Sequence, residues 1–396
     1  MKHTAIDIAS ALKPEFASEE YKQRRQRAAA LMLSQGIDAL LLNSEANNRY
    51  FTGHTSGRWL SRTRPIFLII TKEGAATILC STKSEADTAL MTTAGGCEIK
   101  VFGGTGHDIK PGIKGVVDEL TALGLDRGRV AAELGVHHRP QLSAMAFESI
   151  REALPQLKLV DGSGLLWRAR ATKSVGEIDY IRTAIGVTDR MYDKVPEWLG
   201  AAESERAAFT RVGLDVLTFG AEAFGYRSVN DVTQPPGAGY TDRPIRKNSV
   251  IYIDSTCSVA GYWADFARIF AVGAPTSELE DTYKRLWDIT GEEINAVRPG
   301  ATINEVYSVA RRATERLTGT TPTLGRVGHS IGLEIVEPPS LCEEEQWVLE
   351  PGMVFCIEPS LNSPSGSTLI AEEMVVVTET GFELLTKRAT ERLLRI

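Results

Sequence analysis

The sequence has few cysteines, and it lacks a long apolar run. Five cysteines occur among 396 residues, at scattered positions and with no CxxC pair. This pattern favours reduced thiols over a disulfide framework. No apolar stretch approaches the length of a membrane span, so no membrane association is expected. The first sixteen residues include acidic groups and no long apolar region, which is unlike a signal peptide. Together these features predict a cytoplasmic protein.

An excess of positive charge is also missing. The chain has 51 acidic and 44 basic residues and a formal net charge of −7. It therefore offers no basic surface for nucleic acid or an anionic membrane. A hydrophobic content of 43% and a charged content of 24% are typical of a globular protein. The length exceeds one ordinary core and predicts two domains.

The chain divides into two regions of different pattern. Helical and extended segments alternate over residues 1–170, which predicts an α/β domain. Residues 171–396 mix strands with helices near 277–296 and 303–317, which predicts an α+β domain. Between them, Ser174 and Glu177 have the spacing of a capping box and mark the start of a new helix.

Four carboxylates and one histidine in the second region stand inside short apolar runs. They are Asp254 in VIYIDST, Asp265 in YWADFARIF, His329 in GRVGHSIGL, Glu358 in VFCIEPSL and Glu372 in TLIAEEMVVV. Carboxylates are rarely buried unless they are paired or bind a metal. Five such groups in apolar settings therefore predict a metal site.

The spacing of the acids supports this interpretation. A hairpin centred between Val259 and Ala260 would place Asp254 and Asp265 directly opposite each other, and Glu358 and Glu372 are symmetric about Ser365. Opposed residues on paired strands have Cβ atoms about 5 Å apart. Two carboxylates at that separation repel each other unless one is protonated or a cation lies between them.

These motifs, taken in order, resemble the pita-bread metallohydrolases of the prolidase, aminopeptidase P and creatinase branch. The resemblance is carried by IDST…GYWADFAR, GHSIGL, LEPGMVFCIEPSL and EEMVVVTETG, and in the N-terminal region by NNRYFTG. It implies a creatinase-like α/β N-terminal domain, a pita-bread catalytic domain, a homodimer and two divalent metal ions. Oxygen-rich ligation with one imidazole suits manganese, iron, cobalt or zinc.

The resemblance also assigns a role to each of the five residues. Asp254 matches the first aspartate ligand, Asp265 the bridging aspartate and His329 the imidazole ligand. Glu358 matches the first glutamate and Glu372 the bridging glutamate. Such a site implies hydrolysis of a C–N bond in a small molecule, as in an Xaa-Pro dipeptidase, with Glu358 and Glu337 as candidate catalytic residues.

Two histidines expected from the peptidases of this group are missing. The segment Ser228–Lys247 contains no histidine, and Val336 stands where the other is expected, just before Glu337. Those histidines hold the substrate and stabilise the oxyanion in the peptidases. Their absence argues against a general dipeptidase. Three alternatives stay open: a creatine- or ectoine-type hydrolase, a dimethylsulfoniopropionate-type lyase, or a non-catalytic interaction module.

Further candidates for substrate binding come from a basic, aromatic loop in the N-terminal region and from one tyrosine in the second region. They are His54, Arg58, Arg62, Arg64 and, in the second region, Tyr240. Arginine suits carboxylate recognition because its guanidinium presents a bidentate fork. For any single arginine here, a solvated loop is the simpler interpretation. Arg268, three residues after Asp265, is interpreted as a salt-bridge partner of a nearby carboxylate.

Overall fold

The computed structural model describes residues 15–61, 63–104, 106–234, 239–319 and 325–396. The chain forms two compact units, Met1–Arg170 and Ala171–Ile396. No helix among the described residues has both the length and the apolar character needed to cross a membrane. The first unit has an α/β architecture, and the second mixes strands and helices in an α+β architecture.

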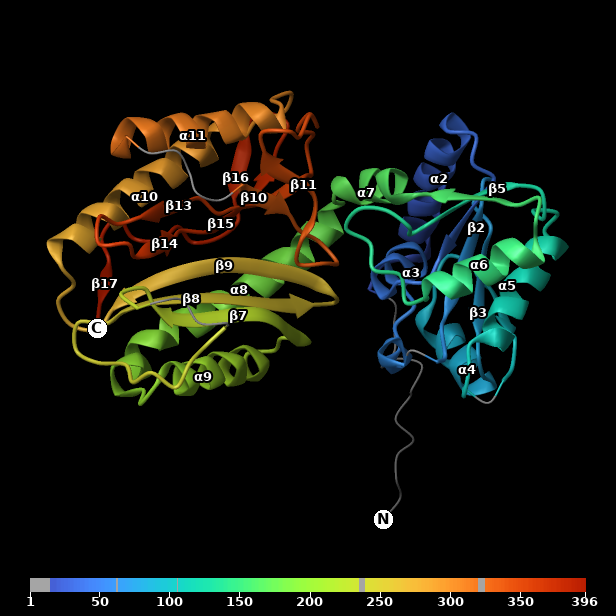
Figure 1. Ribbon diagram of the computed structural model, residues 1–396, viewed down its shortest axis with the longest axis horizontal. Helices are drawn as coiled ribbons and strands as arrows, with labels where there is room; N and C mark the ends of the chain where they lie inside the picture. Colours follow the sequence, from blue (N-terminus) through green and yellow to red (C-terminus); the bar gives the residue numbers. More distant parts are fainter. Residues whose placement is uncertain (1–14, 62, 105, 235–238, 320–324) are drawn as a thin grey trace, which may run out of the picture. The chain divides into compact units, whose positions relative to one another are not determined.

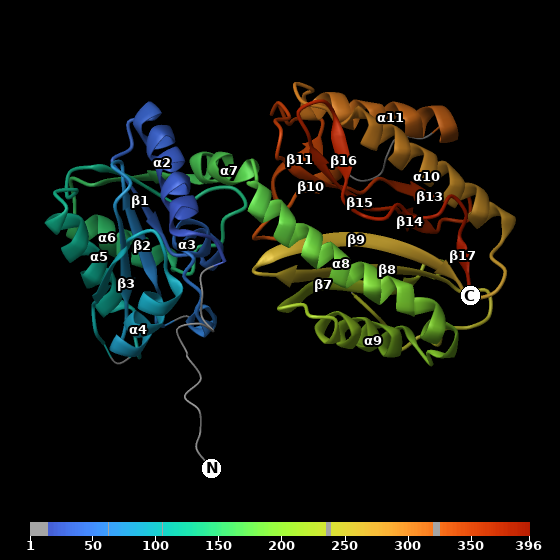
Figure 2. The ribbon, with the colours of Figure 1, turned by 180° about the vertical axis from the view of Figure 1, so that it is seen from behind.

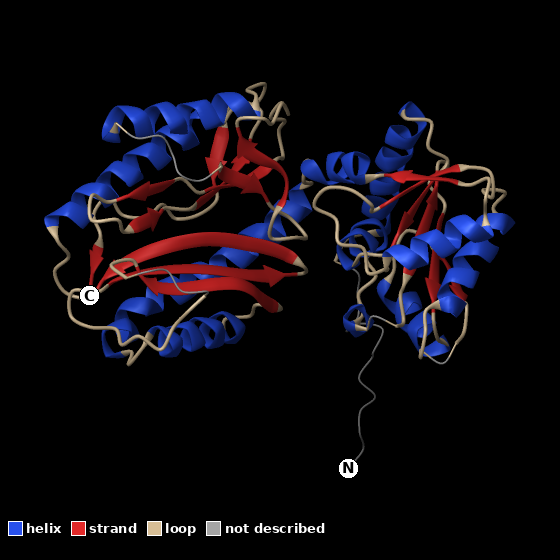
Figure 3. Cartoon of the chain, viewed as in Figure 1, coloured by secondary structure: helices blue, strands red, loops and turns tan. Residues whose placement is uncertain are grey.

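The N-terminal unit is built on one mixed sheet of six strands in the order β4-β3-β2-β1-β5-β6. Strands β1–β3 pair antiparallel, whereas β3–β4, β1–β5 and β5–β6 pair parallel. Its elements are α2 (Ser18–Ser34), β1 (Ala39–Leu42), α3 (Glu45–Thr52), η1 (Gly57–Leu60), β2 (Phe67–Thr71), β3 (Ala76–Cys80), α4 (Lys83–Thr92), β4 (Glu98–Val101), α5 (Lys110–Ala122), β5 (Arg129–Ala132), α6 (Ala144–Ala153), β6 (Lys158–Asp161) and α7 (Ser163–Ala171). Helices lie against the sheet (Figure 3), and α5 and α6 share a core with its strands.

The C-terminal unit contains a curved four-stranded sheet, a five-stranded sheet and a short two-stranded sheet. Its elements are α8 (Val175–Trp198), η2 (Leu199–Ala201), α9 (Glu205–Thr218), β7 (Ala223–Asp231), β8 (Val250–Val259), β9 (Tyr262–Ala271), α10 (Ser277–Ala296), α11 (Ile303–Thr318), β10 (Arg326–Ser330), β11 (Glu337–Cys342), β12 (Val354–Ile357), β13 (Ser360–Asn362), β14 (Thr368–Ile370), β15 (Glu373–Val377), β16 (Phe382–Leu384) and β17 (Leu394–Arg395). Helices α8 and α9 cover one sheet, and α10 and α11 cover the other strands (Figures 1 and 2). The strands therefore form the middle of this unit.

Helix α8 begins as its sequence predicts. Ser174 is the N-cap, its hydroxyl accepts from the Glu177 amide, and the Glu177 carboxylate accepts from the Ser174 amide, so the predicted capping box is present. Two of the orphan amides at the helix start are thereby satisfied. Further along α8, the Tyr192 hydroxyl contacts the carbonyl oxygens of Ile253 and Phe266 at 3.0 and 2.7 Å. This contact fixes the helix on strands β8 and β9, the strands that carry both aspartates.

The β8–β9 hairpin corrects the predicted pairing of the two aspartates. Asp254 pairs with Ala267 and Asp265 pairs with Thr256, so the aspartates are diagonal neighbours rather than opposed residues. The turn lies one position later than expected because Ala260 and Gly261 both have positive φ, at 51° and 75°. Two such residues form the centre of a tight hairpin. A shift of one position in the turn moves the pairing by two residues, which keeps both aspartates on one face.

The predicted symmetry of the glutamates about Ser365 is confirmed. Ile357 pairs with Glu373 and Ser360 pairs with Ile370, so both ladders keep the same register. Glu358 and Glu372 stand opposite each other at the gap between these ladders. Backbone pairing is interrupted there, which leaves both side chains at the end of a strand.

Helix α10 carries a buried carboxyl group that the sequence pattern did not single out. Glu293 has no exposed surface, and neither carboxylate oxygen has a hydrogen bond among the described residues. Burial, and then the charge of Glu358, hold the pKa of Glu293 well above its usual value. The folded state therefore keeps a proton that the unfolded chain releases, so stability falls as pH rises above the ordinary glutamate pKa of about 4.3.

We expect Glu293→Met to stabilise the protein at alkaline pH. Met has a similar shape and no polar group, so the variant should gain about 1–3 kcal/mol at pH about 8 and less at pH about 5. Urea unfolding at the two pH values measures the difference from wild type. Glu293→Gln is the matched control, because it removes the charge and keeps an unpaired polar group. An equal effect of Met at both pH values would contradict this account.

Candidate metal centre

The five predicted ligands come together between the two larger sheets of the C-terminal unit. Asp254 lies on β8, Asp265 on β9 and His329 on β10, while Glu358 directly follows β12 and Glu372 directly precedes β15. The His329 Nε2 atom lies 3.7 Å from Asp265 Oδ2 and 3.8 Å from Glu358 Oε1. Ligand atoms of Asp265, His329 and Glu372 all lie within 4.8 Å of one another.

Burial and mutual repulsion dominate the electrostatics of this cluster. Burial raises the pKa of Asp254 to about 7. The pKa values of Asp265 and Glu372 are also raised well above their usual range, first by burial and then by the neighbouring carboxylates. The pKa of Glu358 is raised by burial, against the opposing effect of Arg326. Four carboxylates so arranged cannot all be ionised without a compensating charge.

His329 is suited to a neutral ligand role. Burial lowers its pKa to about 4, so the imidazole is uncharged near neutral pH. Its Nδ1 lies 2.9 Å from the Ser330 carbonyl oxygen, which can only accept, so Nδ1 carries the proton. Nε2 then presents a lone pair to the carboxylates. This arrangement of a backbone carbonyl behind the ring is the usual one for a metal-binding histidine.

The donor set fits divalent cations. Asp254 Oδ1 and Glu372 Oε1 are buried and have no hydrogen-bond partner among the described residues. Buried oxygens of this kind are costly unless a cation or a donor satisfies them. Four carboxylates contribute a charge of about −4, which two divalent ions would neutralise. Oxygen ligands with one imidazole match manganese, iron, cobalt or zinc.

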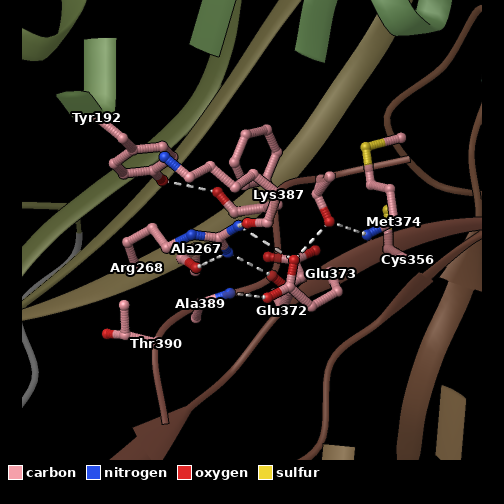
Figure 4. A network of polar contacts seen from close by, with 12 residues as sticks. Tyr192, Ala267, Arg268, Cys356, Glu372, Glu373, Met374, Lys387, Ala389 and Thr390 are labelled. Atoms are coloured by element: carbon pink, nitrogen blue, oxygen red, sulfur yellow. Dashed lines mark hydrogen bonds and ion pairs between the residues drawn. The ribbon is translucent and has the colours of Figure 1, made fainter. Parts of the chain in front are cut away.

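A network of polar contacts holds the Glu372 segment in place (Figure 4). Arg268 Nη1 donates to the Glu372 carbonyl oxygen at 3.0 Å, and its Nη2 forms an ion pair with Glu373 at 3.0 Å. Glu373 also accepts from the Ala389 amide at 2.7 Å and from the Thr386 hydroxyl. The interpretation of Arg268 as a salt-bridge partner is confirmed. These contacts fix the backbone from which the Glu372 side chain extends.

Cys356, which is not among the predicted ligands, belongs to the same cluster. Its Sγ lies within 4.8 Å of the ligand atoms of Asp265, His329 and Glu372, and it contacts the Asp265 carbonyl oxygen at 3.4 Å. Burial, followed by the nearby carboxylates, holds the pKa of this thiol well above its usual value. The spacing to Glu358 could have indicated this, because Cys356 lies two residues before it and alternate side chains along a strand share a face.

Glu337, one of the two candidate catalytic residues, has a buried cation beside it. Lys173 Nζ lies 3.4 Å from Glu337 Oε2 and 3.1 Å from Ser330 Oγ, and the side chains of Lys173 and Glu337 are each 1% exposed. Glu337 Oε1 accepts from the Glu334 amide at 3.1 Å. Nothing in the spacing of the sequence connects Lys173 with Glu337, because they are far apart along the chain.

The residues proposed for substrate binding lie in several places. His54 is buried, with Nδ1 2.8 Å from Thr92 Oγ1 and Nε2 3.2 Å from Glu85, and Arg58 lies 3.5 Å from the same carboxylate. Arg64 is partly buried, and Arg62 lies outside the described residues. In the C-terminal unit, the Tyr240 hydroxyl lies 3.3 Å from Arg206 Nη1. Their role in substrate binding stays a prediction.

Comparison with known proteins agrees with the fold, an N-terminal creatinase-type α/β domain followed by a C-terminal pita-bread domain. The model of metallopeptidase family M24 matches residues 179–379, and that of the creatinase/prolidase N-terminal domain matches residues 24–172. The chain belongs to metallopeptidase family M24. It is accordingly a metallohydrolase, and members of this family normally bind divalent metals.

Two relatives and one solved structure illustrate the similarity. The probable dipeptidase PepE of Mycobacterium tuberculosis is 26% identical over 92% of this chain and 94% of its own length. The Xaa-Pro dipeptidase of Pyrococcus furiosus is 25% identical over 70% of this chain and 77% of its own length. The crystal structure of dipeptidase PepE from Mycobacterium ulcerans has a TM-score of 0.82 and 24% identity, covering 96% of this chain and 99% of that one.

Proposed function

We propose that this M24 protein is a dinuclear metallohydrolase that cleaves an amide or peptide C–N bond in a small molecule. The buried cluster of four carboxylates and a neutral imidazole supports the proposal most directly. Asp254 and Asp265 would hold one ion, and His329 and Glu358 would help to hold the other. Asp265 and Glu372 would bridge the pair. Manganese is the first metal to test, with iron, cobalt and zinc as alternatives.

The chain's own groups have separate tasks in this reaction. Divalent cations bound in the cluster would make a hydroxide nucleophile available near neutral pH and would polarise the scissile carbonyl group. Glu358 is the best-placed proton carrier, because its side chain is 21% exposed while the other three acids are more deeply buried. Arg326 Nε, 3.3 Å from Glu358 Oε1, orients this carboxylate. Glu358 can then transfer a proton to the leaving nitrogen.

We also propose that general dipeptides are poor substrates. Val336 is half-buried beside Glu337, at a place where the resemblance to the peptidases of this branch predicts a histidine. A valine side chain can neither donate to an oxyanion nor accept from a substrate amine. Loss of a side chain that donates a hydrogen bond to an oxyanion costs about 10²–10³-fold in rate. The substrate is therefore a specialised molecule that other contacts hold.

Two further proposals concern the environment of the enzyme. We propose a homodimer, from the resemblance to the prolidase and creatinase branch. We propose a cytoplasmic location, because all five cysteines are unpaired thiols and such thiols persist in a reducing compartment. Light scattering on the purified protein distinguishes a dimer from a monomer.

Metal analysis combined with a product assay tests the main proposal. We expect about two divalent ions per chain, as the charge of four carboxylates requires. The metal-loaded protein should release an amine from at least one member of a panel of dipeptides, acylated diamines and guanidino compounds. Formation of an alkene without addition of water would indicate a lyase instead. A protein that binds no metal and releases no amine would contradict the proposal.

A further inference from the structure

A cavity of about 500 Å³ lies beside the metal cluster in the C-terminal unit. Ser228, which lines it, stands opposite Asp254 in the β7–β8 ladder. Tyr252 also lines it, two residues before Asp254 on β8. Residues two apart on a strand point to the same side, so the cavity and Asp254 share one face of the β7–β8 ladder. The cavity is therefore next to the reaction site.

The charge of this cavity is unusual for a site expected to receive a free carboxylate. Among the lining residues that the structure describes there is no lysine, arginine or histidine. The single charged group is Asp231, which is 8% exposed. Arg326 does not line the cavity, and it is already paired with Glu358. A carboxylate entering this space would find no cation and would face Asp231.

Only one of the two carboxylate oxygens of Asp231 accepts hydrogen bonds from the described residues. Oδ1 accepts from the Thr233 amide at 3.1 Å, the Thr233 hydroxyl at 2.8 Å and the Val250 amide at 3.3 Å. Oδ2 has no hydrogen bond and no ion pair among the described residues. By contrast, the neighbouring acid Glu205 has Arg243 at 3.5 Å. Asp231 thus supplies an uncompensated negative charge on a rigid support.

Two aromatic rings complete the lining. Tyr226 and Tyr252 both border the cavity, and an aromatic face attracts a cation electrostatically. Asn230 and Ser228 add hydrogen-bonding groups without charge. A carboxylate combined with aromatic rings is suited to an ammonium or guanidinium group and unsuited to an anion.

We propose that this cavity binds a positively charged nitrogen of the substrate, an ammonium or a guanidinium group. The statement that the bound molecule is the substrate rests on the proposed hydrolase function. Asp231 lies three residues along β7 from Ser228, which corresponds to about 10 Å. The favoured substrate is an amide whose amine portion carries a cation about that far from the scissile bond. An Xaa-Pro dipeptide, with a free carboxylate in that region, is disfavoured.

Calorimetric titration of the full-length, Mn²⁺-loaded protein with three matched probes tests this assignment. The probes are N-acetylhexanediamine, acetamidohexanoate and N-hexylacetamide, which share an acetamide and a hexyl chain and end in a cation, an anion or a methyl group. We expect the cationic probe to bind at least about tenfold more tightly than the anionic probe. Equal or tighter binding of the anionic probe would overturn the proposal.

Asp231→Asn is the matched variant, because asparagine keeps the Oδ1 acceptor that the fold uses. We expect it to weaken binding of the cationic probe by about tenfold and to leave N-hexylacetamide unchanged. Asp242→Asn is the control, since Asp242 is an exposed acid paired with Arg206 outside the cavity. An unchanged affinity of Asp231→Asn for the cationic probe would also sink the assignment.

The outcomes separate this inference from the proposed function. If the protein binds the cationic probe through Asp231 but hydrolyses no amide, the cation site is supported and the proposed hydrolase function is refuted. If the protein hydrolyses amides but prefers the anionic probe, the hydrolase function is supported and the cation site is refuted.

Discussion

Asp265→Ala should remove most of the bound metal and nearly all of the activity while the protein still folds. Asp265 is the residue that both ions would share, and its carboxylate is within 4.8 Å of the ligand atoms of His329 and Glu372. Loss of a group outside the ligand shell already costs about 10–100-fold in metal affinity or activity. Loss of a bridging ligand should exceed that. Elemental analysis and amine release measure the two effects.

The folding of this variant has its own physical reason. Burial and the neighbouring acids raise the pKa of Asp265, so the ionised carboxylate is unfavourable in the metal-free cluster. Removing it relieves repulsion among Asp254, Glu358 and Glu372. The metal-free variant should therefore unfold at a temperature no lower than metal-free wild type. Asp242→Ala serves as the control for metal content, and an unchanged metal content in Asp265→Ala would refute the ligand assignment.

The sequence predicted that the five candidate ligands would cluster because three of them lie on apolar strands and the two glutamates stand directly beside strands. Side chains on a strand alternate, so a single acid in VIYIDST or in YWADFARIF has only one way to reach the interior. The symmetry of Glu358 and Glu372 about Ser365 was correct because one register continues through two ladders. The capping box at Ser174 is a local interaction and needs only four residues to be recognised.

The errors and omissions came from backbone conformation and from distant contacts. The turn at Ala260 and Gly261 requires two positive φ values. Alanine is not among the residues that favour a positive φ, so nothing in the sequence signalled the position of the turn. Glu293 becomes buried when α10 packs in the tertiary structure, and the sequence around it predicts only an amphipathic helix. The cavity beside Asp231 is formed by strands and turns far apart in the chain. Such features depend on tertiary packing, which spacing in one segment does not encode.

Lys173→Met should be among the most destabilising single substitutions in the C-terminal unit. Lys173 follows α7, its amide donates to the Gly352 carbonyl oxygen at 2.9 Å, and its Nζ contacts Ser330 and Glu337. Removing one partner of a buried ion pair costs about 3–5 kcal/mol, because the other charge stays buried. Because Ser330 is adjacent to His329, metal affinity should fall as well. Urea unfolding gives the first quantity and metal titration the second.

A double-mutant cycle with Glu337 decides what this carboxylate does. Lys173→Met/Glu337→Gln removes both charges, so it should be more stable than Lys173→Met alone, with a coupling of about 0.5–3 kcal/mol. If Glu337 only balances Lys173, activity should recover together with stability in the double variant. If Glu337 carries a proton during the reaction, the double variant should be stable and bind metal but stay inactive. A double variant no more stable than Lys173→Met would show that the two charges do not compensate each other.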